Sequence, residues 1–269
     1  MDIAPGAVMV RRVRRSAVRA LNDIMRTSRT DPDPAEIRQP RQLVHLAIAH
    51  RIGVSIVTGR TPPGTVLDGE VAFSIEHGVS RSAVREAMRM LDAKGLVESR
   101  PKTGTRVRPR SDWNLLDPVL LAWMFEAEPP ADFVKSLFQL RMIIEPAASE
   151  LAAVHRDDDQ LARMGRALDD MARHGLASEP GQVADQLFHH ILLEATRNEL
   201  LVSLSGSITS AVRWTTIFKH RQAGLPRDSM PQHRMLHAAV ADGDPAAARA
   251  ATITLLHQAQ EDTEHWLGR

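Results

Sequence analysis

Residues 79–108 contain a short helical segment, a glycine and two β-like runs, and this order restricts the local fold more than any other feature of the chain. Ser80 precedes the helical segment and can cap its first free N–H groups. Apolar residues recur at helical spacing behind it and would face a core: Val84, Met88 and Leu91. Gly95 ends the segment, and Gly104 can supply positive φ in a turn. The two runs are residues 96–100 and 106–108. The pattern predicts a core-anchored helix followed by a β-hairpin.

The first turn of this helix carries Arg81 and Arg85, which lie four positions apart and therefore on one face. An exposed turn of this kind can enter the major groove of DNA, where arginine is the best bidentate partner for guanine. The alternative is that both arginines are solvated surface charges. Lys102 and Arg106 in the hairpin would contact DNA or only supply general electrostatic attraction.

Two further helices are predicted upstream. From residue 38, apolar residues keep a helical period: Leu43, Leu46, Ala47, Ile48, Ile52 and Ile56. A Pro-Gly turn follows, and Val66 and Leu67 lead into a second helix at about 69–77. Three helices and a hairpin predict a winged helix-turn-helix domain over residues 38–108.

Charge divides the chain in two. Residues 1–110 hold 20 Lys and Arg against 11 Asp and Glu, a net of +9, and the remainder holds 14 against 22, a net of −8. The basic half, including an arginine-rich extension at 1–37 that reads as a helix or a disordered arm, favours a polyanionic partner. The sequence has no cysteine, which excludes disulfides and thiolate chemistry and fits a cytoplasmic location. No apolar run approaches a membrane span.

Residues 109–118 read as a linker, and the chain after them shows helical runs and no strand pattern. Four polar residues are placed to cap helices: Asp117, Asp157, Asn198 and Ser229. The runs lie near 118–127, 131–154, 157–174, 180–196, 198–222, 229–241 and 244–267. They predict an all-helical bundle domain at 119–269 with its own core, so the fold class is mainly α.

Two sets of residues carry a resemblance to a known family. The first domain resembles the winged helix-turn-helix of the GntR family through Pro63-Gly64-Thr65, Leu67, Glu70, Gly78-Val79-Ser80-Arg81, Val84-Arg85-Glu86-Ala87, Leu91, Gly95-Leu96-Val97 and Gly104-Thr105. The second resembles the ligand-sensing FCD domain of the FadR subfamily through Leu140-Arg141, Glu145-Pro146, Asp185, Phe188-His189, Asn198, His233 and Ala239. The junction is similar to that of regulators responding to galactonate and related sugar acids, through Trp113-Asn114, Leu116-Asp117, Leu121 and Trp123. His77 and Gly69 depart from the family pattern.

The resemblance implies a homodimeric transcription regulator, in most relatives a repressor, that binds a pseudo-palindromic double-stranded DNA operator. Because no apolar run has the length of a membrane span, we expect no membrane partner. The positions that would contact DNA are Ser80, Arg81, Ser82 and Arg85 in the helix and Lys102, Gly104 and Arg106 in the wing.

The resemblance also implies a divalent metal ion held by Asp185, His189 and His233. Spacing alone would make Asp185 and His189 an ordinary surface pair, although residues four apart on a helix do converge. One carboxylate and two imidazoles suit Zn²⁺, and also Mn²⁺, Ni²⁺ or Fe²⁺. The family's usual fourth histidine is Leu255 here, so we expect three protein ligands completed by water or effector. His257 lies roughly 200° further around the helix, and His237 is a surface or partly buried alternative.

A small carboxylate effector, in this subgroup a sugar acid, is the implied ligand of the second domain. Arg141 is the best candidate to bind its carboxylate, because an arginine on an apolar helix is costly unless paired. The alternative is an internal salt bridge to Glu145, four residues on. Arg213 aligns with an arginine of sugar-acid regulators, and Asn198 either binds the effector or caps a helix.

Two other functions remain open from the sequence. The bundle could serve only for dimerisation around a structural metal, in a regulator that ignores ligands. A metal-dependent enzyme fused to a DNA-binding domain is the other, although the chain shows no nucleophile motif, phosphate loop or general base beside the predicted ligands.

Overall fold

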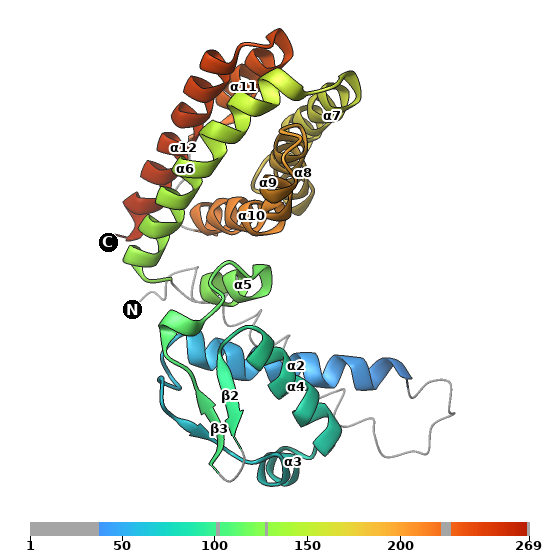
Figure 1. The fold of residues 1–269 in the computed structure, drawn as a ribbon, viewed down its shortest axis with the longest axis vertical. Helices are drawn as coiled ribbons and strands as arrows, with labels where there is room; N and C mark the ends of the chain where they lie inside the picture. Colours follow the sequence, from blue (N-terminus) through green and yellow to red (C-terminus); the bar gives the residue numbers. More distant parts are fainter. Residues whose placement is uncertain (1–37, 101–102, 127–128, 222–226, 268–269) are drawn as a thin grey trace, which may run out of the picture.

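The computed structural model describes residues 38–100, 103–126, 129–221 and 227–267, so the predicted extension at 1–37 lies outside the described residues. Helices make up most of this part of the chain, together with one small sheet, as the mainly α prediction requires. Figure 1 shows an N-terminal body (α2–α4 and the sheet) and a C-terminal bundle (α6–α12), with α5 between them. No helix in the described ranges combines the length and apolar character that a membrane crossing requires.

The N-terminal body contains the three predicted helices. These are α2 (Arg38–Val57), α3 (Glu70–His77) and α4 (Arg81–Ala93). Ser80 caps α4 by accepting a hydrogen bond from the Ala83 backbone N–H at 3.2 Å. Val84, Met88 and Leu91 are buried against α2, as their spacing predicted. The charged first turn of α4 is therefore presented outward from a packed core.

The sheet has three strands rather than the predicted two. β1 (Val66–Leu67), β2 (Val97–Arg100) and β3 (Gly104–Val107) run antiparallel in the order β1-β3-β2. Val66 and Leu67 precede the second helix as predicted, but they form a strand that was not predicted, and a hydrogen bond from the Val107 N–H to the Thr65 carbonyl at 2.9 Å fixes the segment to β3. β3 also begins two residues earlier than predicted. Gly104 adopts φ +80° and pairs directly with Arg100, which shortens the turn.

Residues 109–118 pack closely on the N-terminal body. A 3₁₀ turn at Arg110–Asp112 passes over Gly95, where any side chain would overlap the Asp112 carbonyl. Trp113 is buried and its indole N–H donates to the Arg108 carbonyl at 3.0 Å. Lys94 binds both carboxylate oxygens of Asp117, at 2.8 and 2.9 Å. This segment, predicted as a linker, is thus joined to the N-terminal body by hydrogen bonds and an ion pair.

Helix α5 (Pro118–Glu126) contributes to two cores. Asp117 caps it, as predicted, by accepting from the backbone N–H groups of Val119 and Leu120. Leu120, Trp123 and Met124 belong to the core of the N-terminal body. Leu121 and Phe125 pack instead with residues of α6 and α10. The division at 108 and 118 stays a prediction, and α5 is the element that both bodies share.

The bundle comprises α6 (Ala131–His155), α7 (Asp158–His174), α8 (Glu179–Glu194), α9 (Glu199–Ser203), α10 (Ser205–Arg221), α11 (Met230–Asp242) and α12 (Pro245–Leu267). The long helices α6 and α12 lie side by side (Figure 1). The single helix predicted at 198–222 is wrong. Asn198 caps only the short α9, and a tighter bond from the Leu204 N–H to the Leu201 carbonyl ends it before α10 begins.

Two other predicted caps have different outcomes. Asp157 forms a reciprocal capping box with Gln160 at the start of α7. Ser229 makes no side-chain cap, so that prediction is wrong. Asp228 provides one instead by accepting from the Met230 N–H at 2.9 Å. The Ser229 backbone carbonyl is thereby positioned for a different partner, His233.

Candidate nucleic-acid interface and metal centre

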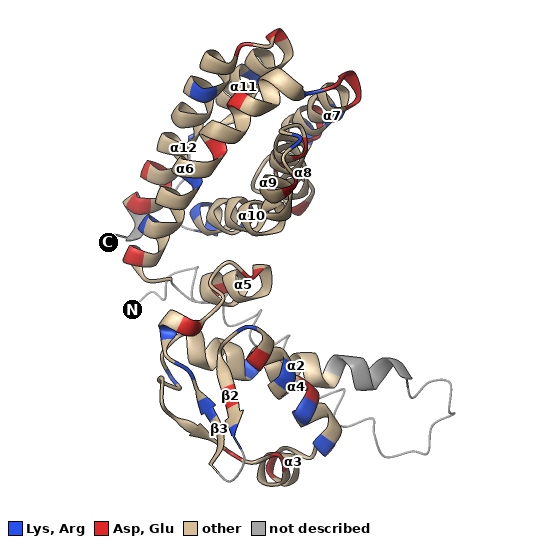
Figure 2. Cartoon of the chain, viewed as in Figure 1, with Lys and Arg blue, Asp and Glu red and all other residues tan. Residues whose placement is uncertain are grey.

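The first turn of α4 presents polar side chains to solvent. Ser80, Arg81, Ser82 and Arg85 are all exposed. Arg81 makes no hydrogen bond or ion pair with any described residue, and the hydroxyls of Ser80 and Ser82 lie 3.1 Å apart. Figure 2 shows Lys and Arg along α4 and the adjoining strands. This geometry suits a helix that inserts its N-terminal turn into a groove.

Arg85 is held by an acid on the neighbouring helix. Its Nε and Nη2 donate to the Glu70 carboxylate of α3, with the Nη2–Oε2 distance at 2.8 Å. This hydrogen bonding raises the pKa of Arg85 and lowers that of Glu70. Both side chains are substantially exposed, so the pair adds little stability. Its effect is to orient the guanidinium, which can exchange the carboxylate for a phosphate or a base edge.

The hairpin supplies the other predicted DNA positions. Gly104 and Arg106 are exposed on β3, and Arg106 stands opposite Glu98 of β2. Lys102 lies outside the described residues. Sequence reasoning placed these groups on one wing, and the pairing of β2 with β3 agrees for Gly104 and Arg106. Contact with DNA stays a prediction for all of them.

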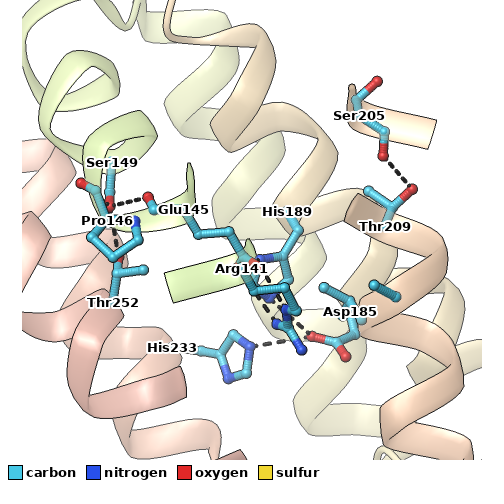
Figure 3. Close-up of polar contacts among 12 residues, drawn as sticks. Arg141, Glu145, Pro146, Ser149, Asp185, His189, Ser205, Thr209, His233 and Thr252 are labelled. Atoms are coloured by element: carbon cyan, nitrogen blue, oxygen red, sulfur yellow. Dashed lines mark hydrogen bonds and ion pairs between the residues drawn. The ribbon is translucent and has the colours of Figure 1, made fainter. Parts of the chain in front are cut away.

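Asp185, His189 and His233 converge in the bundle and are called the metal cluster below. Asp185 and His189 come from successive turns of α8, and His233 comes from the first turn of α11. None is more than 3% exposed. Asp185 Oδ1 lies 3.2 Å from His233 Nε2 and 3.7 Å from His189 Nε2, and one potential ligand atom from each residue lies within 4.8 Å of the others. Figure 3 shows His233 and Asp185 directed at each other from facing helices.

A neutral His233 ring presents a lone pair to the Asp185 carboxylate. Its Nδ1 lies 2.8 Å from the Ser229 carbonyl, which can only accept, so Nδ1 carries the proton. Nε2 of a neutral ring is then an acceptor. It faces Asp185 Oδ1, also an acceptor, and neither atom has a hydrogen-bond partner among the described residues. Two buried acceptors at this distance repel unless a cation or proton lies between them.

His189 is approached by a second carboxylate. Its Nδ1 lies 3.2 Å from Glu145 Oε2 of α6, in a close approach that departs from hydrogen-bond geometry. Glu145 is itself paired with Arg141, whose Nε donates to Oε1 at 2.6 Å. Burial alone would raise the pKa of Glu145, but the charges of Arg141 and His189 lower it to about 2. Burial likewise opposes ionisation of Asp185, yet a proton on His233 or His189, together with the charge of Lys219, holds its pKa far below the usual range.

The three predicted effector residues do not form one group. Arg141 is buried in its ion pair with Glu145 and also donates to the Thr215 hydroxyl at 3.3 Å, which matches the internal salt-bridge alternative. Arg213 lies 3.7 Å from Glu179 in the first turn of α8, well before Asp185. Asn198 is exposed and caps α9. Effector binding by these residues stays a prediction.

The remaining histidines lie outside the metal cluster. His257 is exposed, and Leu255 is buried in the bundle core where the family's fourth ligand would be. His237 lies 3.3 Å from the Leu161 carbonyl. The number of protein ligands stays a prediction.

Sequence reasoning missed Lys219, Thr216 and the Ser229 carbonyl. Thr216 donates to Asp185 Oδ2 at 3.3 Å, and Lys219 lies one turn further along α10 with 4% of its surface exposed. A lysine in register with the apolar residues Ile208 and Val212 was the available signal. The role of the Ser229 carbonyl could not be predicted, because every residue has a backbone carbonyl.

Comparison with known proteins gives the family. Residues 45–107 match the gntR family of bacterial regulatory proteins, and residues 136–258 match the FCD domain. The galactonate operon transcriptional repressor of Escherichia coli is 31% identical over 76% of this chain and 90% of its own length. The chain belongs to the GntR family. LutR, a transcriptional regulator of Bacillus subtilis, is 32% identical over 77% of this chain and 94% of its own.

One solved structure of the same fold is that of Lar, which controls the Listeria monocytogenes agr system. It is 18% identical, covers 84% of this chain and 96% of its own, and superposes with a TM-score of 0.59. This GntR-family chain is accordingly a DNA-binding transcription regulator with an N-terminal helix-turn-helix domain and a C-terminal FCD domain.

Proposed function

We propose that the chain is a homodimeric repressor whose bundle binds a divalent metal ion, with Zn²⁺ as the first candidate, and senses a sugar acid or related carboxylate. Binding of the acid to the metal-loaded bundle releases a pseudo-palindromic operator. The similar galactonate operon repressor and the Uxu operon regulator of Escherichia coli support a sugar-acid operon as the target.

The observation that carries the proposal is the pair of opposed acceptors, Asp185 Oδ1 and His233 Nε2, 3.2 Å apart and buried. A metal ion converts this repulsion into two ligand bonds. The Ser229 carbonyl and the Glu145 carboxylate then act on the far nitrogens of the two histidines, an arrangement that orients metal-bound imidazoles. With three protein ligands, the ion keeps positions open for a carboxylate.

The DNA-binding half of the proposal uses the exposed turn of α4. Arg81 has no partner among the described residues, and Arg85 has one that a phosphate or base can replace. We propose that Ser80, Arg81, Ser82 and Arg85 read the major groove while the wing carrying Gly104 and Arg106 lies against the backbone. Two copies would place two such helices on successive half-sites.

The test of metal binding is elemental analysis combined with thermal unfolding. Purified protein should hold about one divalent ion per chain, and a chelator should lower its melting temperature. Asp185→Asn should lose the ion, whereas Asp169→Asn, an exposed change on α7, should keep it. A stable chain with no ion in either variant or the native protein would contradict the proposal.

The test of sensing is a thermal-shift screen of carboxylic acids. Aldonic acids should raise the melting temperature of metal-loaded protein and have no effect after chelation, because ligand stabilises the state that it binds. A protein that holds metal but responds to no acid at millimolar concentration would favour the alternative of a structural metal and a ligand-independent regulator.

A further inference from the structure

Lys219 is a buried cation that is not one of the three residues of the metal cluster. It is 4% exposed on α10, and within the described residues it forms no hydrogen bond and no ion pair. It lies one helical turn beyond Thr216, which contacts Asp185 directly. Burial lowers the pKa of Lys219, while the charges of Asp185 and Asp262 act to raise it. An ammonium group so placed is costly unless an anion joins it.

A cavity of about 330 Å³ opens at this lysine. Its charged walls are Lys219, Arg227 and Arg234 against the single carboxylate of Asp228, a net of +2 with His220 neutral. The volume lies within the range of about 300–1,000 Å³ that is usual for small-molecule sites. Ser229 also lines the cavity, and its carbonyl fixes His233. The cavity and the metal cluster therefore share a wall.

The cations of the cavity are not equally engaged. Arg227 already binds Asp262 at 2.7 Å and Glu261 at 2.9 Å. Lys219 and Arg234 have no such partner among the described residues. One of these two is buried and the other is exposed on α11, so they can act on a ligand from the floor and the rim of the cavity.

We propose that the cavity binds a second anionic group of the effector, whose first carboxylate is bound by the metal cluster. The effector is then a dianionic acid, with a terminal carboxylate or a phosphate at the end remote from the metal. Lys219 is the specificity-determining residue, because a charge-assisted contact at a buried ammonium favours the second anion strongly. This inference rests on the proposed function and narrows its ligand class.

The test is calorimetric titration of full-length, zinc-loaded protein with three acids on one carbon skeleton. These are an aldonate with one carboxylate, the aldarate with two, and the aldonate phosphorylated at its far end. At least one dianion should bind roughly 10- to 100-fold more tightly than the aldonate, and the two dianion arms tell carboxylate from phosphate. Lys219→Met should abolish that preference, so that the three acids bind the variant with affinities within about twofold of one another.

The matched control is Lys135→Met, an exposed lysine of α6, which should keep the native preference. Arg234→Gln provides a second variant at an exposed site and should reduce the preference in part. Equal affinity of the native protein for all three acids, or an unchanged preference in Lys219→Met, would overturn the inference while leaving the proposed function intact. If none of the three acids binds to metal-loaded protein, both this inference and the proposed sensing of an acid are contradicted.

Discussion

Arg141 and Glu145 show how single residues of the bundle balance buried charge. Both are nearly inaccessible, and Arg141 uses Nε and Nη2 on Glu145 and Nη1 on Thr215. Removal of one partner of such a pair leaves an uncompensated buried charge, whereas replacement of both by apolar side chains is near neutral. The pair is therefore informative in single and double substitution.

We expect Arg141→Met to lower the free energy of unfolding by about 3–5 kcal/mol, because Glu145 would be left buried and ionised. The double variant Arg141→Met with Glu145→Leu should recover most of that loss. Urea denaturation of chelated protein, followed by circular dichroism, measures both without a contribution from metal. If the single and double variants lose the same free energy of unfolding, the unpaired charge of Glu145 is not the cause of the loss.

Arg81 and Arg85 differ in their surroundings, and the difference has a consequence for DNA binding. Each change to alanine should weaken operator binding by about 1–3 kcal/mol, or roughly 5- to 150-fold. Arg85→Ala also leaves the Glu70 carboxylate unpaired near the phosphates, so it should cost at least as much. Gel-shift titration with Arg173→Ala, an exposed residue of α7, as control is the measurement. If both variants bind the operator with the affinity of the native protein, α4 is not the recognition helix.

At the scale of helices and strands, periodicity and capping residues were sufficient for most boundaries. The Ser80, Asp117, Asp157 and Asn198 caps start helices where the sequence placed them. β1 could not be predicted, because a two-residue strand exists only through its pairing with β3. The break at Leu204 was also missed, although the residues around it, Ser203, Ser205 and Gly206, all have low helix propensity.

Helices α2 and α5 are joined by His50 and Glu126, whose Nε2 and Oε2 lie 2.6 Å apart. The hydrogen bond to Glu126 raises the pKa of His50, partly opposed by burial, and lowers the pKa of Glu126, which also feels Arg221. The stabilisation from His50 is complete below the pKa of 6.5 that this group has in the unfolded chain. It is lost as the pH rises through the higher pKa of His50 in the folded protein. The glutamate loses its contribution as pH falls through its own lowered pKa.

The native protein should therefore lose more stability between pH 6 and pH 8.5 than His50→Gln. The pair is half exposed, so the difference should be below about 1 kcal/mol. Urea midpoints at the two pH values give the comparison, with His257→Gln as an exposed control on α12. Parallel pH curves for native protein and His50→Gln would show that the pair contributes nothing.

Gly53 permits the close contact of the same two helices. A Cβ at this position would overlap the indole of Trp123. Gly53→Ala should destabilise the protein by about 1–3 kcal/mol through overpacking, even though alanine favours helix. Gly165→Ala is a matched control, since its Cβ would meet only His237 at 3.7 Å. The control should gain up to about 1 kcal/mol, and thermal unfolding that shows the same sign for both would contradict this packing argument.

At the scale of the whole molecule, the metal cluster and the DNA-binding helix are connected through α10 and α5. Thr216 of α10 contacts Asp185. The same helix reaches the segment just before α5, where Ser207 donates to the Leu116 carbonyl at 2.7 Å, and it reaches α5 itself, where Arg221 donates to the Phe125 carbonyl at 3.2 Å. Residues of α5 and α4 belong to the same core of the N-terminal body. A shift of α10 on ligand binding could therefore be transmitted to α4 through packed side chains.

The sequence identified this architecture through charge asymmetry and the two family patterns, and it named all three residues of the metal cluster. It could not show how they are supported. The opposed acceptors, the Ser229 carbonyl and the buried ammonium of Lys219 arise from helices far apart in the chain, and only packing brings them together.

The most direct test of the account is release of operator DNA measured by fluorescence anisotropy at fixed ionic strength. Protein loaded with metal should bind the duplex and release it as a sugar acid is added. Chelated protein and Asp185→Asn should bind the same duplex and fail to respond to the acid, because ligand can shift DNA affinity only through its differential affinity for the two states. Equal release with and without metal would contradict the central claim that acid is sensed at the Asp185–His189–His233 cluster.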